Sequence, residues 1–116
     1  MNRFILGASV VLCGLTYATA GVTQPQDNVA RGKQLYMKDK CYTCHGTRGA
    51  GGGIAGPKLA PNPLPLEAVK IQLRQPASRM PPYSPMVLSD AQVADIYAYL
   101  KSIPASKPAS EIPLLK

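Results

Sequence analysis

The feature that most constrains this chain is the stretch Cys41-Tyr-Thr-Cys44-His45. Two thiols three positions apart, followed at once by an imidazole, form the pattern that attaches a c-type haem. Each thiol can form a thioether with one vinyl group of the porphyrin, and the histidine can then bind the iron. His45 is the only histidine of the 116 residues. The pentad predicts one covalent haem c per chain, held by Cys41 and Cys44, with His45 as an axial ligand of the iron.

Other uses of two cysteines and a histidine agree less well with the rest of the chain. A zinc site needs about four ligands, and the one further cysteine, Cys13, lies near the N-terminus. A thioredoxin-like redox pair sits in a βαβ pattern, and no segment here has the alternation of a convincing strand. A disulfide across two intervening residues would close a tight ring of little stabilising value. Haem attachment is therefore the favoured interpretation.

The N-terminus has the pattern of an export signal. Met1-Asn2-Arg3 is a short positive start, residues 4–15 are apolar, and Ala18-Thr19-Ala20 resembles a signal-peptidase site. Residues 1–20 are thus predicted to be a cleavable signal peptide, whose removal also removes Cys13. Since covalent haem attachment belongs outside the cytoplasmic membrane, we expect a periplasmic protein that does not span the membrane after cleavage.

An uncleaved membrane anchor is the alternative. No residue between Arg3 and Asp27 is charged, and a stretch of that length can span a bilayer with help from its flanks. Glycine, serine and threonine dilute it, which favours cleavage. The mature chain then divides into one small domain over residues 21–104 and a flexible, proline-containing tail over residues 105–116. The whole chain has no tryptophan, 12 prolines and 10 glycines, so a haem would supply much of the apolar core of so small a domain.

Three segments have helical patterns, and we expect an all-α fold of three to four short helices around the haem. A first helix is predicted from a cap at Asp27 or Asn28 to about Lys38. A middle helix is predicted over residues 66–74, bracketed by prolines, with its apolar residues on one face. The loop between them, residues 46–65, is rich in glycine and proline.

The last helix has the clearest signals. Ser89, with Gln92 three residues later, forms a predicted capping box, and Pro104 ends the helix. Between them apolar residues recur at helical spacing and form a stripe along one face. The stripe consists of Val93, Ile96, Tyr97 and Leu100.

This order of elements resembles the class I cytochromes c. The resemblance covers about residues 28–103, and rests on the haem pentad, a Gly-Pro-x-Leu loop, a Met-Pro dipeptide and the ending LSDAQVADIYAYLKSIP. It implies the cytochrome c fold. It also implies that Gly32 and Tyr36 pack across the last helix, with Ile96 and Tyr99 as their partners, because a glycine lets two backbones approach closely.

The resemblance further implies a partner for His45. Gly56-Pro57-Lys58-Leu59 matches the Gly-Pro-x-Leu loop of the family, in which the proline carbonyl accepts a hydrogen bond from Nδ1–H of the proximal histidine. Such a bond orients the ring and makes it a better donor to iron. Pro57 and Leu59 are thus candidate cofactor-binding residues. The alternative for Gly56-Pro57 is a simple turn.

The chain has no second histidine, so we expect a methionine sulfur as the sixth iron ligand if the chain provides one. Met37 lies on the proximal side and is expected to be a packing residue, whereas Met86 lies too close to the last helix to cross the haem face. Met80 begins Met-Pro-Pro-Tyr, which resembles the ligand loop of the family, and two prolines would stiffen that loop. We expect Met80 as the ligand. Tyr83 and Arg79 are expected to reach a haem propionate or the haem edge.

His/Met ligation closes both faces of the iron and suits electron transfer. The acidic residues show no acid–base pair or nucleophile constellation, so we expect a one-electron carrier rather than an enzyme. Two alternatives stay open: an electron-accepting cytochrome subunit of a periplasmic dehydrogenase, and a haem enzyme or gas sensor with an open sixth position.

The charge distribution suggests the kind of partner. Residues 31–79 hold nine basic and two acidic residues, whereas residues 80–116 hold three of each. A positive field around the haem-binding part would attract redox proteins with an acidic docking surface. Nucleic acid is not expected as a partner of an exported cytochrome. A role of the charge in solubility alone is the alternative.

Overall fold

The computed structural model describes residues 25–51 and 56–115, and these contain helices but no strands. The predicted signal peptide and Cys13 lie outside the described residues. The helices are α1 (Pro25–Lys38), α2 (Tyr42–His45), α3 (Leu66–Arg74) and α4 (Asp90–Ser102), followed by two 3₁₀ turns, η1 (Ala109–Glu111) and η2 (Pro113–Leu115). The all-α expectation is confirmed. No helix within the described ranges is both apolar and long enough to cross a bilayer.

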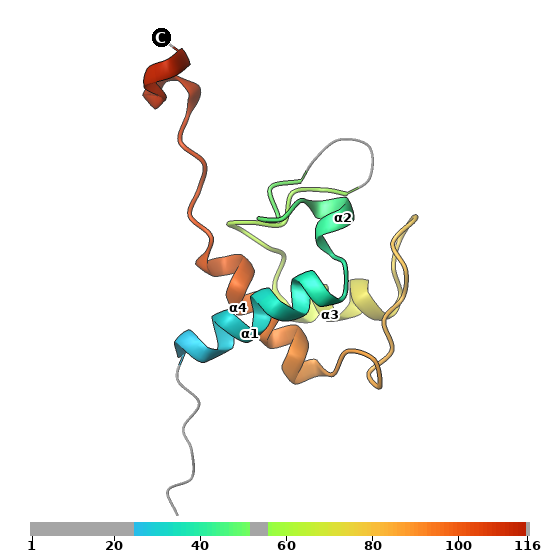
Figure 1. The fold of residues 1–116 in the computed structure, drawn as a ribbon. Coiled ribbons are helices and arrows are strands. Elements are labelled where there is room, and N and C mark those ends of the chain that lie inside the picture. Colours follow the sequence, from blue (N-terminus) through green and yellow to red (C-terminus); the bar gives the residue numbers. More distant parts are fainter. Residues whose placement is uncertain (1–24, 52–55, 116) are drawn as a thin grey trace, which may run out of the picture.

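The crossing of α1 and α4 forms the centre of the fold (Figure 1). Gly32 on α1 makes this crossing possible, because a Cβ atom there would lie 1.9 Å from the backbone oxygen of Asp95 and 3.0 Å from the nitrogen of Ile96. Only a residue without a side chain permits such an approach. One turn on, the ring of Tyr36 packs against that of Tyr99 with 5.6 Å between centroids. The expected packing of Gly32 and Tyr36 across the last helix is confirmed.

The hydrophobic core lies between these helices. Tyr36, Leu88 and Val93 are its largest fully buried side chains. Of the predicted stripe on α4, Val93, Ile96 and Leu100 are buried, but Tyr97 is only partly buried and its ring lies 5.6 Å from the ammonium of Lys101. Tyr99 takes its place in the core. The prediction for Tyr97 was wrong because the contact with Tyr36 on α1, rather than helical spacing alone, selects the aromatic residue that is buried.

The first helix begins earlier than predicted. It starts at Pro25, so Asp27 and Asn28 lie within its first turn and neither is its cap. A proline is well suited to the first turn of a helix, because its fixed φ is helical and the first amides lack partners anyway. Asp27 still has a favourable position, because a negative side chain in the first turn opposes the positive end of the helix dipole.

The other two long helices match their predictions. α3 spans residues 66–74 as expected, and Leu66, Val69 and Leu73 face the core. α4 begins with the predicted capping box: the Ser89 hydroxyl accepts from the Gln92 amide, and the Gln92 side chain accepts from the Ser89 amide. These bonds satisfy two amides that the helix leaves without partners.

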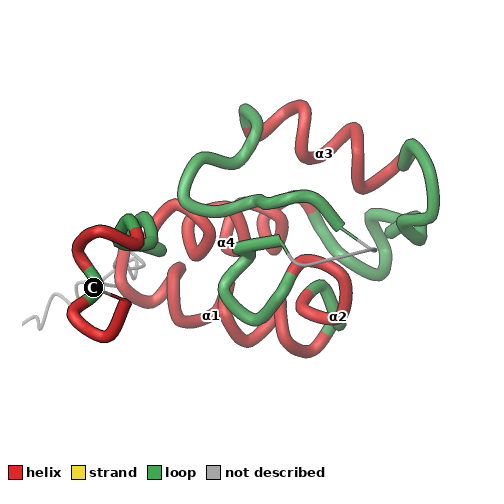
Figure 2. The backbone as a smooth tube through the Cα atoms, turned by 90° about the horizontal axis from the view of Figure 1, so that it is seen from above, coloured by secondary structure: helices red, strands yellow, loops and turns green. Residues whose placement is uncertain are grey.

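The remaining segments join the helices at one end of the fold. α2 and α3 lie at the same end of the α1–α4 pair, on either side of the chain that runs between them (Figure 2). Residues 46–51 and 56–65 contain no helix, as predicted for this loop. After α4 the chain runs away from the helices, and its segment 105–115 includes η1 and η2 (Figure 1). The prediction of a flexible tail did not include these turns.

Candidate haem-binding site

α2 presents the two cysteines and the histidine of the pentad on one helical turn. Cys41 and Cys44 are both free and partly buried, and the His45 side chain is buried. The chain enters this turn through Lys40, whose φ of 60° is left-handed. The Thr43 hydroxyl donates to the Lys40 carbonyl at 2.7 Å and closes the turn. A helix of four residues is too short to have a periodic signal, so the sequence did not predict it.

The imidazole of His45 is oriented by the loop that follows. Its Nδ1 lies 2.8 Å from the carbonyl oxygen of Pro57, which is the contact that the resemblance implies. Since a carbonyl only accepts hydrogen bonds, Nδ1 carries the proton and the lone pair of the neutral ring is on Nε2. That lone pair is the one available to a metal. The imidazole therefore has the tautomer that an axial ligand needs.

Gly56 makes this contact possible. A Cβ atom at this position would lie 2.8 Å from His45 Nδ1 and 2.8 Å from the Cys44 carbonyl oxygen. The backbone of the loop thus fits directly against the imidazole, and a side chain would separate them. Leu59, three residues further along the loop, is partly buried and packs against the hydrophobic core.

Two tyrosine hydroxyls tie the start of this loop to the crossing of α1 and α4. Tyr36 Oη donates to the Gly46 carbonyl at 2.7 Å, and Tyr99 Oη donates to the Thr47 carbonyl at 3.0 Å. Burial raises the pKa of Tyr36, so its hydroxyl stays protonated and can donate. The loop then folds back on itself, because the amides of Leu59 and Ala60 both donate to the Gly49 carbonyl. The segment next to His45 therefore has several independent supports.

The Cys41 thiol lacks the property of a reactive redox cysteine. Burial, and after it the nearby Asp39 carboxylate, raise the pKa of Cys41 to about 11. Reactive cysteines of redox pairs have the opposite property, a lowered pKa. Among the described residues, no three histidine, cysteine, aspartate or glutamate side chains converge as metal ligands. The donor set of two thiols and one oriented imidazole fits a haem c.

The three methionines of the described residues occupy different environments. Met80 is partly buried and packs against the core, and its sulfur lies 4.0 Å from Nε2 of Gln72 on α3. Met86 is 97% exposed, and Met37 on α1 is 38% exposed. Only Met80 combines contact with the core and a position on the segment that follows α3.

Tyr83 brings the Met80 segment to the pentad. Its hydroxyl donates to the carbonyl of Asp39, two residues before Cys41, at 2.9 Å. Burial is the largest cause of the raised pKa of Tyr83, and the charges of Cys41, Asp39 and Cys44 raise it further. Two segments more than 40 residues apart in sequence thus meet here. The sequence prediction for Tyr83, a contact with a haem propionate or the haem edge, did not include this hydrogen bond.

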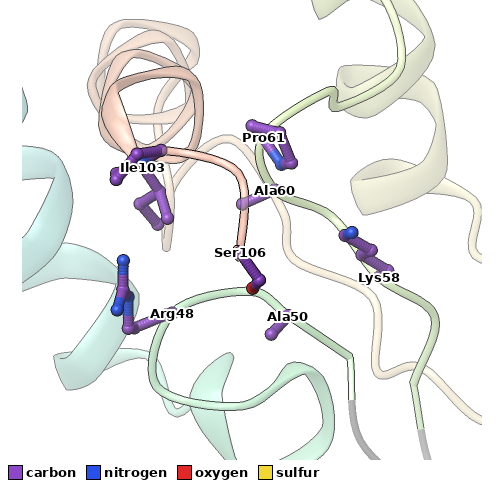
Figure 3. Close-up of a pocket in the computed structure, with 8 residues that line it drawn as sticks. Arg48, Ala50, Lys58, Ala60, Pro61, Ile103 and Ser106 are labelled. Carbon is purple, nitrogen blue, oxygen red and sulfur yellow. The ribbon is translucent and has the colours of Figure 1, made fainter. Parts of the chain in front are cut away.

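A small hollow lies beside this site, between the loop after α2 and the end of α4 (Figure 3). Its volume is about 70 Å³. Arg48 and Lys58 are two of the residues around it, and no acidic side chain lines it. Neither the pentad nor Met80 lines this hollow. We therefore regard it as a basic surface next to the candidate haem-binding site and not as part of that site.

Comparison with known proteins gives one match. Residues 27–100 match the family model described as cytochrome c oxidase, cbb3-type, subunit III. The matched range includes all of the candidate site residues, from Cys41 to Met80, and ends within α4. No curated protein and no solved structure matches the chain.

Proposed function

Because the chain belongs to the family described as cytochrome c oxidase, cbb3-type, subunit III, and is a c-type cytochrome with covalently bound haem c, we propose that it is a periplasmic one-electron carrier. In this proposal Cys41 and Cys44 hold the haem, and His45 and Met80 bind its iron. The haem supplies the one-electron redox chemistry. The chain binds it, orients its ligands and provides a surface for partners.

The observation that carries the proposal is the hydrogen bond between His45 Nδ1 and Pro57 O. A buried imidazole held in this way presents Nε2 in a fixed direction, next to two thiols on the same helical turn. Met80 supports the second half of the proposal, because it is the methionine that packs against the core while Met86 is exposed. An iron closed on both faces exchanges electrons and does not bind substrate.

Mass spectrometry tests attachment and export together. After expression with the haem-maturation machinery, we expect the denatured protein to retain one haem and to begin at residue 21. Cys41→Ala and Cys44→Ala should each leave a single thioether, and the double variant should release its haem to acid–acetone. Haem extracted from the unchanged protein would refute the assignment of the cysteines, and an intact N-terminus would favour an uncleaved anchor.

Substitution of the methionines tests the sixth ligand. We expect Met80→Ala to open the iron to carbon monoxide in the reduced protein and to lower the reduction potential, because a thioether favours the ferrous state. Met86→Ala is the matched control, since the same side chain is removed from an exposed position. The assignment is wrong if Met86→Ala shows the effect and Met80→Ala does not. A site that binds carbon monoxide without substitution would favour a haem enzyme or gas sensor.

The basic residues of segment 31–79 fall into two groups, those that form an ion pair and those that do not. Arg31 pairs with Asp95, and Lys70 and Arg74 pair with Asp90. The others are exposed and have no ion-pair partner among the described residues. They are Lys33, Lys38, Lys40, Arg48, Lys58 and Arg79. We propose that these unpaired cations steer the protein to acidic redox partners.

Small redox reagents of opposite charge test the steering. The oxidation of the reduced protein by ferricyanide, an anion, should slow as salt is added, because screening shortens the range of attraction to about 10 Å at 0.1 M. Oxidation by a cationic cobalt complex should speed up. Lys40→Glu with Lys58→Glu should weaken both trends, whereas Lys107→Glu in the tail should change them less. Rates that do not depend on salt would restrict the charge to a role in solubility.

The description of the family provides a second candidate, a permanent subunit of a larger oxidase. A subunit would stay bound to its partner at high salt, whereas a carrier that docks by charge would dissociate. Size-exclusion chromatography of the native protein in 0.5 M salt separates the two, with about 0.5 M chosen because the Debye length is then only a few Å. Co-elution with a larger assembly would favour the subunit.

A further inference from the structure

Tyr83 is the main point at which the segment of Met80 is attached to the rest of the fold. Its amide donates to the Leu73 carbonyl at 2.8 Å, and its carbonyl accepts from Arg74 Nη1 at 2.7 Å. Its side-chain hydroxyl donates to the Asp39 carbonyl at 2.9 Å. All three polar groups of this residue are therefore bonded, two to the end of α3 and one to the turn that follows α1.

The residues before Tyr83 have few attachments of their own. Between Pro76 and Pro82 no backbone amide donates to another backbone group of the described structure. Met80 has one polar neighbour, Gln72, at the long distance of 4.0 Å from its sulfur. Two prolines join Met80 to Tyr83, and their fixed φ angles limit how freely the sulfur can move once Tyr83 is held.

Arg74 is itself held in place. Its Nη2 lies 2.6 Å from Asp90 Oδ1, at the start of α4, while Nη1 donates to Tyr83. Only 18% of its side chain is exposed, whereas the Asp90 side chain is 62% exposed, so the bond to the Tyr83 carbonyl is the better shielded of the two. The guanidinium thus joins the end of α3, the start of α4 and the Met80 segment. It can do so because it is planar and has five N–H donors.

We propose that Tyr83 and Arg74 are positioning residues for the Met80 sulfur at the iron. The proposal rests on the proposed function, in which Met80 is the sixth ligand. The Tyr83 hydroxyl bonds to the carbonyl of Asp39, two residues before the first haem thiol. The same bond therefore fixes the segment that contains Met80 relative to the attached haem. Loss of this tie would raise the fraction of molecules in which the sulfur has left the iron. An external ligand then binds more tightly in proportion to that fraction.

Imidazole added to the oxidised holoprotein is the probe, with its binding followed by optical titration. We expect Tyr83→Phe to tighten imidazole binding about fivefold, which corresponds to one hydrogen bond of about 1 kcal/mol. Tyr99→Phe is the matched control, because it removes the same kind of bond, from a tyrosine hydroxyl to the Thr47 carbonyl. It should lower stability by a similar amount and leave imidazole affinity within twofold of the unchanged protein.

A second pair of variants keeps the proposal testable if Tyr83→Phe folds poorly. Arg74→Gln should also tighten imidazole binding, whereas Arg31→Gln breaks the Arg31–Asp95 ion pair elsewhere and should not. Equal effects of Tyr83→Phe and Tyr99→Phe, or of Arg74→Gln and Arg31→Gln, would overturn the proposal, because the residues would then act on the fold alone.

Met80→Ala separates this proposal from the one on which it rests. With Met80 as the ligand, Met80→Ala should bind imidazole far more tightly, and adding Tyr83→Phe should have no further effect, since the two act through one sulfur. A full fivefold effect of Tyr83→Phe in the Met80→Ala background would overturn the positioning role alone. Unchanged imidazole affinity in Met80→Ala would overturn the ligand assignment and the positioning role with it.

Discussion

The loop that orients His45 and the segment that contains Met80 are built in different ways. Residues 46–51 and 56–60 are fixed at several points: two tyrosine hydroxyls donate to the carbonyls of Gly46 and Thr47, and the carbonyl of Gly49 accepts from two amides. Residues 76–87 depend mainly on Tyr83 and on a short turn in which two amides donate to the Ser84 carbonyl, and the buried Leu88 that follows anchors their end in the core. The proximal side of the site is supported by several independent hydrogen bonds, and the distal side by fewer of them.

The difference follows from the place of each segment. The proximal loop lies directly on the α1–α4 core, so buried tyrosines can reach its backbone. The distal segment is largely exposed and contains several prolines, which lack amides and cannot form backbone bonds as donors. A segment with few bonds and much exposure opens at a lower free energy than the core. We therefore expect the Met80–iron bond to be lost before the His45–iron bond under most perturbations.

The largest effect should come from Gly32→Ala, which removes the support of both sides. Its Cβ would lie 1.9 Å from the Asp95 carbonyl oxygen, so α1 and α4 must move apart. We expect a loss of about 3 kcal/mol in the free energy of unfolding, measured by denaturant titration of the holoprotein. Lys33→Ala, at the exposed neighbouring position, is the control and should stay within about 0.5 kcal/mol. A fully stable Gly32→Ala would contradict the close crossing.

Gly56→Ala should affect the proximal side alone. The added methyl group would press on His45 Nδ1 and the Cys44 carbonyl, which should cost about 2 kcal/mol and weaken the hydrogen bond to Pro57. A less strongly bonded imidazole is a poorer donor to ferric iron, so the reduction potential should rise. Voltammetry measures this shift, and Lys58→Arg in the same loop, which keeps the charge, is the control. An unchanged potential would show that Pro57 does not tune the histidine.

Tyr36→Phe tests the redundancy of the proximal loop. Loss of the bond to the partly buried Gly46 carbonyl, which still accepts from the Gly49 amide, should cost about 1.5 kcal/mol of stability. The binding of imidazole to the oxidised iron should nevertheless change less than twofold, because Tyr99 and the Gly49 turn still hold the loop. If Tyr36→Phe opened the iron as far as Tyr83→Phe, the two sides would not differ in the way described.

The smallest effect should come from Ser89→Ala, at the end of the distal segment. The substitution removes the side-chain acceptor for the Gln92 amide at the start of α4 and should cost about 1 kcal/mol of unfolding free energy. Ser89→Thr keeps a hydroxyl and should recover most of the loss. A thermal melt of the three proteins is sufficient, and equal losses in both variants would mean that the cap does not stabilise the helix.

Much of the fold could be predicted from local patterns. The range of α3 and the capping box of α4 matched, because prolines and capping residues specify helix ends through contacts between near neighbours. The start of α1 was missed since Asp27 and Asn28 are good caps in isolation, while Pro25 fits the first turn equally well. α2 was missed because four residues have no period to detect.

The sequence by itself determined the chemistry of this protein: the spacing of two thiols and the only histidine indicates a covalent haem, and it does so without knowledge of the fold. The roles proposed for Met80 and Pro57 came from a resemblance, and the structure adds the hydrogen bond between His45 Nδ1 and the Pro57 carbonyl. The resemblance implied that Tyr99 packs against Tyr36, whereas only the tertiary structure decided that Tyr97 stays partly exposed and that Tyr83 binds Asp39. Those outcomes depend on residues 44 or more positions apart, and a contact across such a distance arises from the packing of whole elements, which no local pattern contains.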